Sequence, residues 1–176
     1  QSSQFVVTNY SYWLAQTMYS NGLQADGENT QLLILDEAHL AGRSLEGFLQ
    51  ISFGRYDKPT VQWHDDWDFQ EWRWNCNRLT TSLKEEATRL ANQIKRSSDV
   101  PRHLVEEHRR VNTLLRKCQS LAQSTTSYVK EVHFWGQNEI VTWTPLWVKD
   151  HTDMLFQAVP KVILLSAILT PHIVEN

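Results

Sequence analysis

Hydrophobic and polar positions along the first 53 residues follow two alternating patterns. Residues 5–8 are β-branched and aromatic, which predicts a strand, and residues 9–19 place apolar side chains three and four positions apart, which predicts a helix. Residues 32–35 are continuously apolar, as expected for a parallel strand that is covered on both faces. A second helix is expected from residue 36 to about residue 53. The order strand, helix, strand, helix predicts a parallel α/β sheet.

The pattern changes to long helices in the middle of the chain. Residues 54–75 contain four tryptophans without a clear period. From residue 79 to about residue 122, apolar positions recur at helical spacing in two segments, which are separated by polar residues at 97–99 and by Pro101. Two such segments in succession predict an antiparallel helical hairpin.

Strand patterns return towards the end of the sequence. Residues 128–135 and 139–143 are rich in β-branched and aromatic residues and flank a glycine-containing turn, which predicts a β-hairpin. A short helix is expected at residues 153–158. A second buried strand is expected at residues 161–165, and it leads directly to Ser166.

These patterns together predict an α/β fold whose parallel sheet is interrupted by a mainly helical insertion. Residues 1–53 and 126–176 would form the sheet domain, and residues 54–125 would form the insertion.

Composition places the chain among globular proteins. Hydrophobic residues make up 41% and charged residues 21% of its 176 positions, and no apolar run is long enough to span a membrane. The start of the sequence lacks the pattern of a signal peptide, so we expect an intracellular protein, cytoplasmic if the source is prokaryotic or viral. Cys76 and Cys118 are not in a CxxC pair, and reduced thiols are expected, although the sequence leaves a disulfide between them open.

The net charge of −3 hides an uneven distribution. Residues 71–130 carry 12 Lys and Arg against 6 Asp and Glu, and the remaining residues carry 5 against 14. A basic middle segment between acidic arms is typical of a protein that binds a polyanion. The alternative is that long solvated helices simply carry many charges.

Two carboxylates and a histidine follow the apolar run at residues 32–35. Asp36 and Glu37 would lie at the carboxyl end of a parallel strand, where ligands bind in open sheets. One carboxylate can hold a metal ion through water while the other polarises an attacking water, with His39 close by. The alternative is that Asp36 only caps the following helix, which would leave Glu37 and His39 unexplained.

A nucleotide also needs a glycine-rich turn that leads from a strand into a helix and ends in a lysine. Gly22 and Gly27 have the right separation, but Glu28 and Asn29 follow them in place of Lys and Ser or Thr. No segment of this sequence therefore matches a phosphate loop.

Three segments resemble one family of DNA helicases. The sequence DEAH at residues 36–39 matches motif II of superfamily 2 helicases, and VILLSAILTP at 162–171 is similar to their motif III. VVTNYSYWL at 6–14 is similar to the segment that precedes motif II in the XPD/DinG branch, which carries a largely helical insertion, the Arch domain, between motifs II and III. Here 126 residues separate His39 from Ser166, and the predicted helical hairpin lies between them.

The resemblance implies a partial RecA-like motor domain of the P-loop NTPase type. By resemblance, Asp36 would coordinate Mg²⁺ through water, Glu37 would activate water, and His39 and Ser166 would couple the nucleotide state to DNA. The phosphate loop, and iron–sulfur cysteines where present, would lie upstream, and a second motor domain would lie downstream. Mg²⁺ and ATP would be cofactors of the full-length protein. Ile168 stands where the family usually has Thr, so coupling is expected to differ.

Single-stranded DNA would be the partner of the insertion, through basic groups and aromatic stacking surfaces. Tryptophans more often anchor a loop against a core, and part of the arginine charge is expected to be paired with Glu106 and Glu107. The candidates are Arg102, Arg109, Arg110, Arg116 and Lys117, with Trp72 and Trp74, and Trp63 and Trp67 as further stacking candidates.

Three functions remain open from the sequence. The first is a fragment of an ATP-dependent DNA helicase, inactive alone, whose partners would be single-stranded DNA, ATP and the rest of the helicase chain, with no membrane. The second is a non-enzymatic DNA- or protein-binding module derived from a helicase. The third is a different metal-dependent phosphohydrolase, for which the sequence lacks a second acidic cluster at another strand end.

Overall fold

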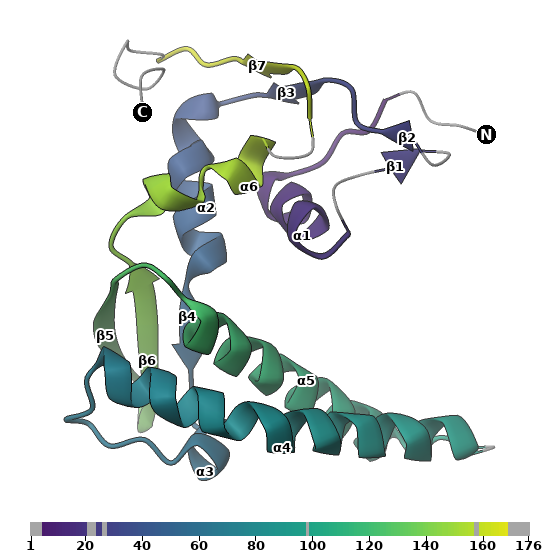
Figure 1. Ribbon diagram of the computed structural model, residues 1–176, viewed down its shortest axis with the longest axis vertical. Helices are drawn as coiled ribbons and strands as arrows, with labels where there is room; N and C mark the ends of the chain where they lie inside the picture. The colour runs from purple at the N-terminus through teal and green to yellow at the C-terminus, as the bar shows by residue number, and fades with distance from the viewer. Residues whose placement is uncertain (1–4, 21–23, 26–27, 98, 157–158, 169–176) are drawn as a thin grey trace. The chain divides into compact units, whose positions relative to one another are not determined.

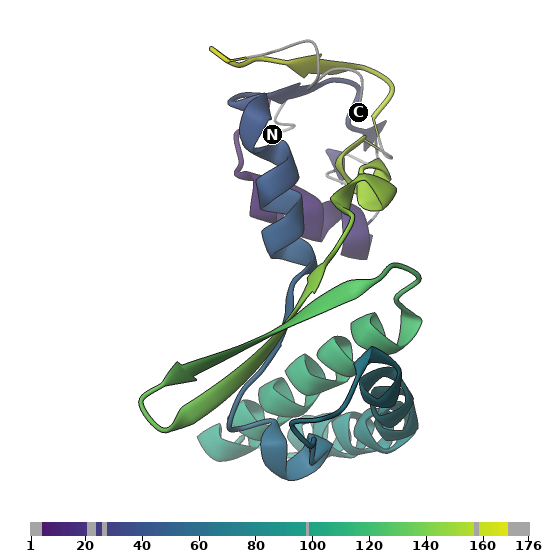
Figure 2. The same cartoon turned by 90° about the vertical axis from the view of Figure 1, so that its left-hand side faces the viewer.

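The computed structural model describes residues 5–20, 24–25, 28–97, 99–156 and 159–168. The chain folds as two compact units, both shown in Figures 1 and 2. Unit 1 comprises residues 1–50 and 145–176, and unit 2 comprises residues 51–144. The division differs from the predicted boundaries, because the strands at 51–53 and 128–145 form one sheet beside the long helices of unit 2.

Unit 1 is a mixed α/β structure with a small parallel two-stranded sheet. Its first helix and both parallel strands lie within two residues of the predicted ranges, but residues 5–8 form no strand. The predicted helix after Asp36 is shorter than expected: it begins as a 3₁₀ turn and its α-helical part ends at Leu49. The elements are α1 (Tyr10–Ser20), β1 (Gln24–Ala25), β2 (Glu28–Asn29), β3 (Leu33–Leu35), η1 (Ala38–Leu40), α2 (Ala41–Leu49), η2 (Val148–His151), α6 (Asp153–Phe156) and β7 (Val162–Leu164).

The sheet of unit 1 joins two strands that are far apart in the sequence. Strands β3 and β7 run parallel, with Leu33 opposite Val162 and Leu35 opposite Leu164. The pairing continues past the strand ends, because the backbone N–H of Ala38 donates to the carbonyl oxygen of Leu165 over 2.9 Å. Residues that follow β3 and β7 therefore emerge at the same edge of the sheet.

Helices α1, α2 and α6 of unit 1 share a small core. Leu14, Ala41, Leu45 and Leu155 pack together and are buried. The buried indole N–H of Trp13 donates to the carbonyl oxygen of Leu155 over 2.9 Å, which satisfies a polar group that would otherwise be costly to bury.

Unit 2 pairs two long helices with a three-stranded sheet. The strand order in the sheet is β4-β6-β5, and β4 pairs antiparallel with β6. Helices α4 and α5 lie side by side in Figures 1 and 2. The elements are β4 (Ile51–Phe53), α3 (Lys58–Val61), α4 (Phe69–Arg96), α5 (Arg102–Gln123), β5 (Tyr128–Trp135) and β6 (Asn138–Pro145).

Helix α4 begins ten residues before the predicted start because of a capping box. The Asp68 carboxylate accepts hydrogen bonds from the backbone N–H groups of Gln70 and Glu71 over 2.8 and 2.9 Å, and the Glu71 side chain accepts from the Asp68 N–H. The first two turns carry polar and aromatic residues, which hides the apolar periodicity of this part of the helix in the sequence.

The core of unit 2 is built from α4, α5 and the sheet. Cys76 and Cys118 are buried in it as free thiols. A hydrogen bond with Cys118, together with burial, raises the pKa of Cys76, so this side chain remains a thiol at neutral pH. No helix in the described part of the chain has both the length and the apolar character that a membrane span requires.

Candidate functional site

The candidate site of unit 1 lies where β3 and β7 end. Asp36 and Glu37 follow β3, and Ser166 follows β7. Because the two strands are parallel and in register, these residues leave the sheet at the same edge. Residues 127 positions apart thus meet: His39 Nδ1 lies 2.7 Å from Ser166 Oγ.

His39 connects the carboxylate of Glu37 to the hydroxyl of Ser166. Its Nδ1 atom lies 3.2 Å from Glu37 Oε2. Nδ1 accepts a hydrogen bond from the Ser166 hydroxyl in one tautomer and donates one to Ser166 Oγ in the other. Ser166 Oγ also accepts from the backbone N–H of Ile168 over 3.2 Å. The contact from Ile168 is made by the backbone, so it does not need the hydroxyl that Thr would supply.

Glu37 has an unusual backbone conformation. Its φ and ψ angles, 50° and 46°, lie in the left-handed region, which costs a non-glycine residue roughly 1–2 kcal/mol. Outliers of this kind cluster at functional sites, where the surrounding structure maintains them. Here the backbone N–H of Glu37 donates to Asp36 Oδ1 over 2.9 Å, and its carbonyl oxygen accepts from Leu40.

Asp36 does not act as a helix cap in the structure, which was the alternative to a role in binding. Neither η1 nor α2 has a side-chain hydrogen bond at its N-terminal cap. Asp36 Oδ1 instead accepts from the N–H of the next residue, and Asp36 is exposed. Mg²⁺ is commonly held by one or two carboxylates together with waters and substrate phosphates, and the Asp36 carboxylate is a ligand of that kind. Within the described residues, no group of three or more His, Cys, Asp or Glu forms a metal site.

Tyr10 is a neighbour of this site that the sequence did not single out. Its position on α1 predicted only a core-facing residue, but its hydroxyl donates to the carbonyl oxygen of Asp36 over 2.8 Å. Burial raises the pKa of Tyr10, and the negative charges of Asp36 and Glu37 raise it further. No pattern in the sequence signals this contact, because it depends on the packing of α1 against the β3–η1 turn.

The raised pKa of Tyr10 predicts a loss of stability at alkaline pH. The folded state holds the phenol proton more tightly than the unfolded state, so the contribution is constant below pH 10 and is lost as the pH rises through the folded pKa. Tyr10→Phe should therefore flatten the decline in unfolding free energy above pH 10, as measured by urea denaturation at pH 8 to 11. An equally steep decline in Tyr10→Phe would show that Tyr10 does not cause it.

The basic candidates of the insertion differ in how they are paired. Arg102 forms an ion pair with Glu106 over 2.7 Å, and Lys117 forms one with the buried Asp57 over 2.8 Å. The remaining three candidates are exposed on α5 and form no ion pair with any residue that the structure describes. These are Arg109, Arg110 and Arg116.

The stacking role predicted for Trp72 is wrong. Its side chain is fully buried, with its ring centroid 5.0 Å from that of Phe53 and 5.7 Å from that of Trp143, so it cannot stack on a base without unfolding of the core. Trp63 is also buried and Trp67 packs against the same core. Trp74, two residues further along α4, is 67% exposed and remains accessible.

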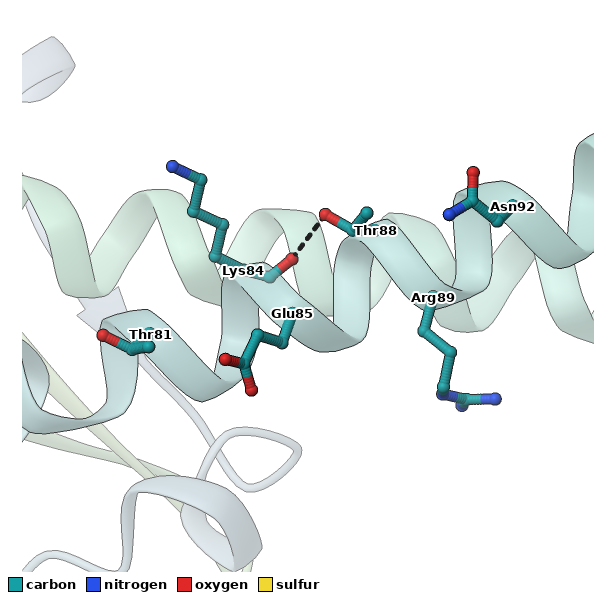
Figure 3. Close-up of a pocket in the computed structure, with 6 residues that line it drawn as sticks. All are labelled: Thr81, Lys84, Glu85, Thr88, Arg89 and Asn92. Atoms are coloured by element: carbon teal, nitrogen blue, oxygen red, sulfur yellow. Dashed lines mark hydrogen bonds between the residues drawn. The ribbon is translucent and has the colours of Figure 1, made fainter.

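A shallow hollow lies on the polar face of α4 and is shown in Figure 3. The hydroxyl of Thr88 donates to the backbone carbonyl oxygen of Lys84 over 2.9 Å, which uses its hydrogen within the helix. Both charge signs are present, so the hollow favours neither an anion nor a cation. The lining residues are Thr81, Lys84, Glu85, Thr88, Arg89 and Asn92.

Comparison with known proteins adds no assignment: no protein-family model matches the chain, and no curated protein sequence matches it.

Proposed function

We propose that this chain is part of the first motor domain of an ATP-dependent DNA helicase of the XPD/DinG type. Unit 1 would belong to a RecA-like domain, and unit 2 would be the insertion that closes over single-stranded DNA. The observation that carries the proposal is the contact between His39 and Ser166 across two parallel strands. That contact joins the DEAH segment to the Ser-Ala segment, as the resemblance requires.

The exposed surface of the small sheet supports a larger sheet in the complete protein. Ile34 and Ile163 lie opposite one another on β3 and β7, and both are exposed. Apolar side chains of parallel strands are normally covered by helices, and two strands alone do not make a stable sheet. Further strands and helices of a RecA-like domain would bury this surface.

The residues at the sheet edge can divide the work of ATP hydrolysis. The Asp36 carboxylate would hold a hydrated Mg²⁺, which supplies positive charge at the phosphates. Glu37 would accept a proton from the attacking water. His39, which lies 3.2 Å from the Glu37 carboxylate and contacts Ser166, would position the carboxylate and transmit its position to the segment after β7.

A non-enzymatic binding module is the second candidate. It is favoured by the separate core of unit 2 and by the exposed arginines of α5. In that case the geometry at Glu37 would be a remnant of a helicase without turnover.

ATP hydrolysis distinguishes the two candidates. The complete protein should hydrolyse ATP with Mg²⁺ and be stimulated by single-stranded DNA, because a phosphate loop and a second motor domain would complete the site. Residues 1–176 alone should show no turnover above background. Steady-state phosphate release measures both. Robust turnover by residues 1–176 would contradict the proposal, and a complete protein without turnover would support the binding module.

A further inference from the structure

The hairpin of β5 and β6 carries aromatic side chains away from the core of unit 2. At its start, Tyr128 stacks on Phe69 with ring centroids 5.4 Å apart, and Lys130 Nζ donates to the carbonyl oxygen of Trp67 over 3.3 Å. Beyond Lys130 this cover ends, and residues 131–135 are all exposed. Figure 2 shows the turn end of the hairpin projecting past α4 and α5.

Two neighbouring aromatic residues form the tip of this hairpin. Phe134 is 73% exposed and Trp135 is 81% exposed. Successive side chains of a strand point to opposite faces, so the two rings present aromatic surface on both sides of the tip. Only Gly136 and Gln137 connect the strands, and Gly136 has a φ of 59°. Glycine adopts a positive φ without the steric penalty that other residues have, so it suits this tight turn.

A cation and a third aromatic ring lie next to the same turn. Arg55 donates to Asn138 Oδ1 over 3.1 Å, and Asn138 is the first residue after the turn. The Arg55 guanidinium also lies over the ring of Tyr56, which is 63% exposed, at 4.5 Å from its centroid. Arg55 forms no ion pair with a carboxylate of the described residues, so its charge is available to an anion.

We propose that unpaired bases of a single-stranded nucleic acid stack on Phe134 and Trp135, while Arg55 binds a backbone phosphate. Single strands are held by this combination of aromatic faces and cations. The class of partner rests on the proposed helicase function, but the site and its chemistry rest on the hairpin itself.

Addition of a protein strand to the free edge of β5 is the competing use of this surface. Lys130 and Glu131 lie along β5, and charged residues on an edge strand oppose pairing with another strand. The exposed aromatic groups are also concentrated at the tip rather than along the edge. Both features favour a stacking partner over a β-strand.

Base stacking can be tested with two oligonucleotides that carry the same charge. The 176-residue chain should bind a 20-nucleotide thymidine strand more tightly than an abasic strand of equal length, as measured by fluorescence anisotropy. Phe134→Ala combined with Trp135→Ala should weaken binding of the thymidine strand about 5- to 100-fold and leave binding of the abasic strand unchanged, because only base stacking is lost. Both residues are exposed, so the variant should fold normally, which circular dichroism checks.

Two control variants separate this site from its alternatives. Trp147→Ala removes an exposed tryptophan of unit 1 that belongs to no proposed binding surface, and it should not reproduce the effect. Charge reversal at Arg109 and Arg110 should lower affinity for both strands and reduce the salt dependence, whereas the hairpin variant should leave the salt slope unchanged. Equal binding of the two strands by the unaltered chain, or a hairpin variant with unchanged affinity, would overturn the proposal. A hairpin variant that alters only self-association would assign the tip to a protein contact. The assay needs no ATP, so it can fail or succeed independently of the proposed hydrolysis.

Discussion

Glu37→Gln in the complete protein should abolish ATP turnover while nucleotide binding persists. A positioned general base contributes about 10²–10⁴-fold to a rate, and Gln cannot accept the proton from water. Gln has the same shape and the same cost in the left-handed conformation of residue 37, so the fold should be unchanged. The contact between His39 and Ser166 does not involve the side chain of residue 37, so the substitution should leave it in place. Steady-state phosphate release and titration with a fluorescent nucleotide measure the two effects.

Glu46→Gln provides a matched control for this experiment. Glu46 lies on α2 in the same unit but is not part of the sheet edge. Its substitution by Gln removes the same negative charge as Glu37→Gln. ATP turnover by the Glu46→Gln protein should equal that of the unaltered protein. Turnover by Glu37→Gln within about threefold of the unaltered protein would exclude Glu37 as the base, since the expected loss is far larger.

The sequence predicted those parts of the fold that depend on local pattern. Helices α1 and α5, the β5–β6 hairpin and strands β3 and β7 lie close to their expected ranges, because each has a helical period, a strong turn signal or a continuous apolar run. It failed around residues 51–75, where β4 is only three residues long and α4 begins with polar and aromatic residues. The capping box at Asp68 and Glu71 was a signal that could have located the start of α4.

The residues of the candidate site could be predicted from the sequence, but the backbone conformation and contacts that position them could not. Asp36, Glu37, His39 and Ser166 follow directly from two short segments. The left-handed conformation of Glu37 and the Tyr10 contact arise from packing between elements, which no local pattern records. Burial likewise decides which tryptophans are accessible, and their spacing in the sequence does not separate Trp72 from Trp74.

The difference in burial between Trp72 and Trp74 gives a second prediction with a large effect. Trp72→Ala should reduce the unfolding free energy by about 3–5 kcal/mol, as for other large core side chains, because Trp72 is fully buried among four aromatic rings. Trp74→Ala should change it by less than about 1 kcal/mol, since Trp74 is mostly exposed. Urea denaturation followed by circular dichroism measures both values in the 176-residue chain.

Trp72→Phe refines this comparison. The indole N–H of Trp72 is buried and has no hydrogen-bond acceptor among the described residues, so Phe keeps an aromatic ring and removes an unpaired polar group. Its loss of stability should be much smaller than that of Trp72→Ala. Trp72→Ala could instead keep the unfolding free energy of the unaltered chain and lose affinity for single-stranded DNA. That result would show that Trp72 acts at an exposed stacking surface and is not part of the core. Stability and DNA affinity measured on the same three variants therefore decide between packing and recognition at this residue.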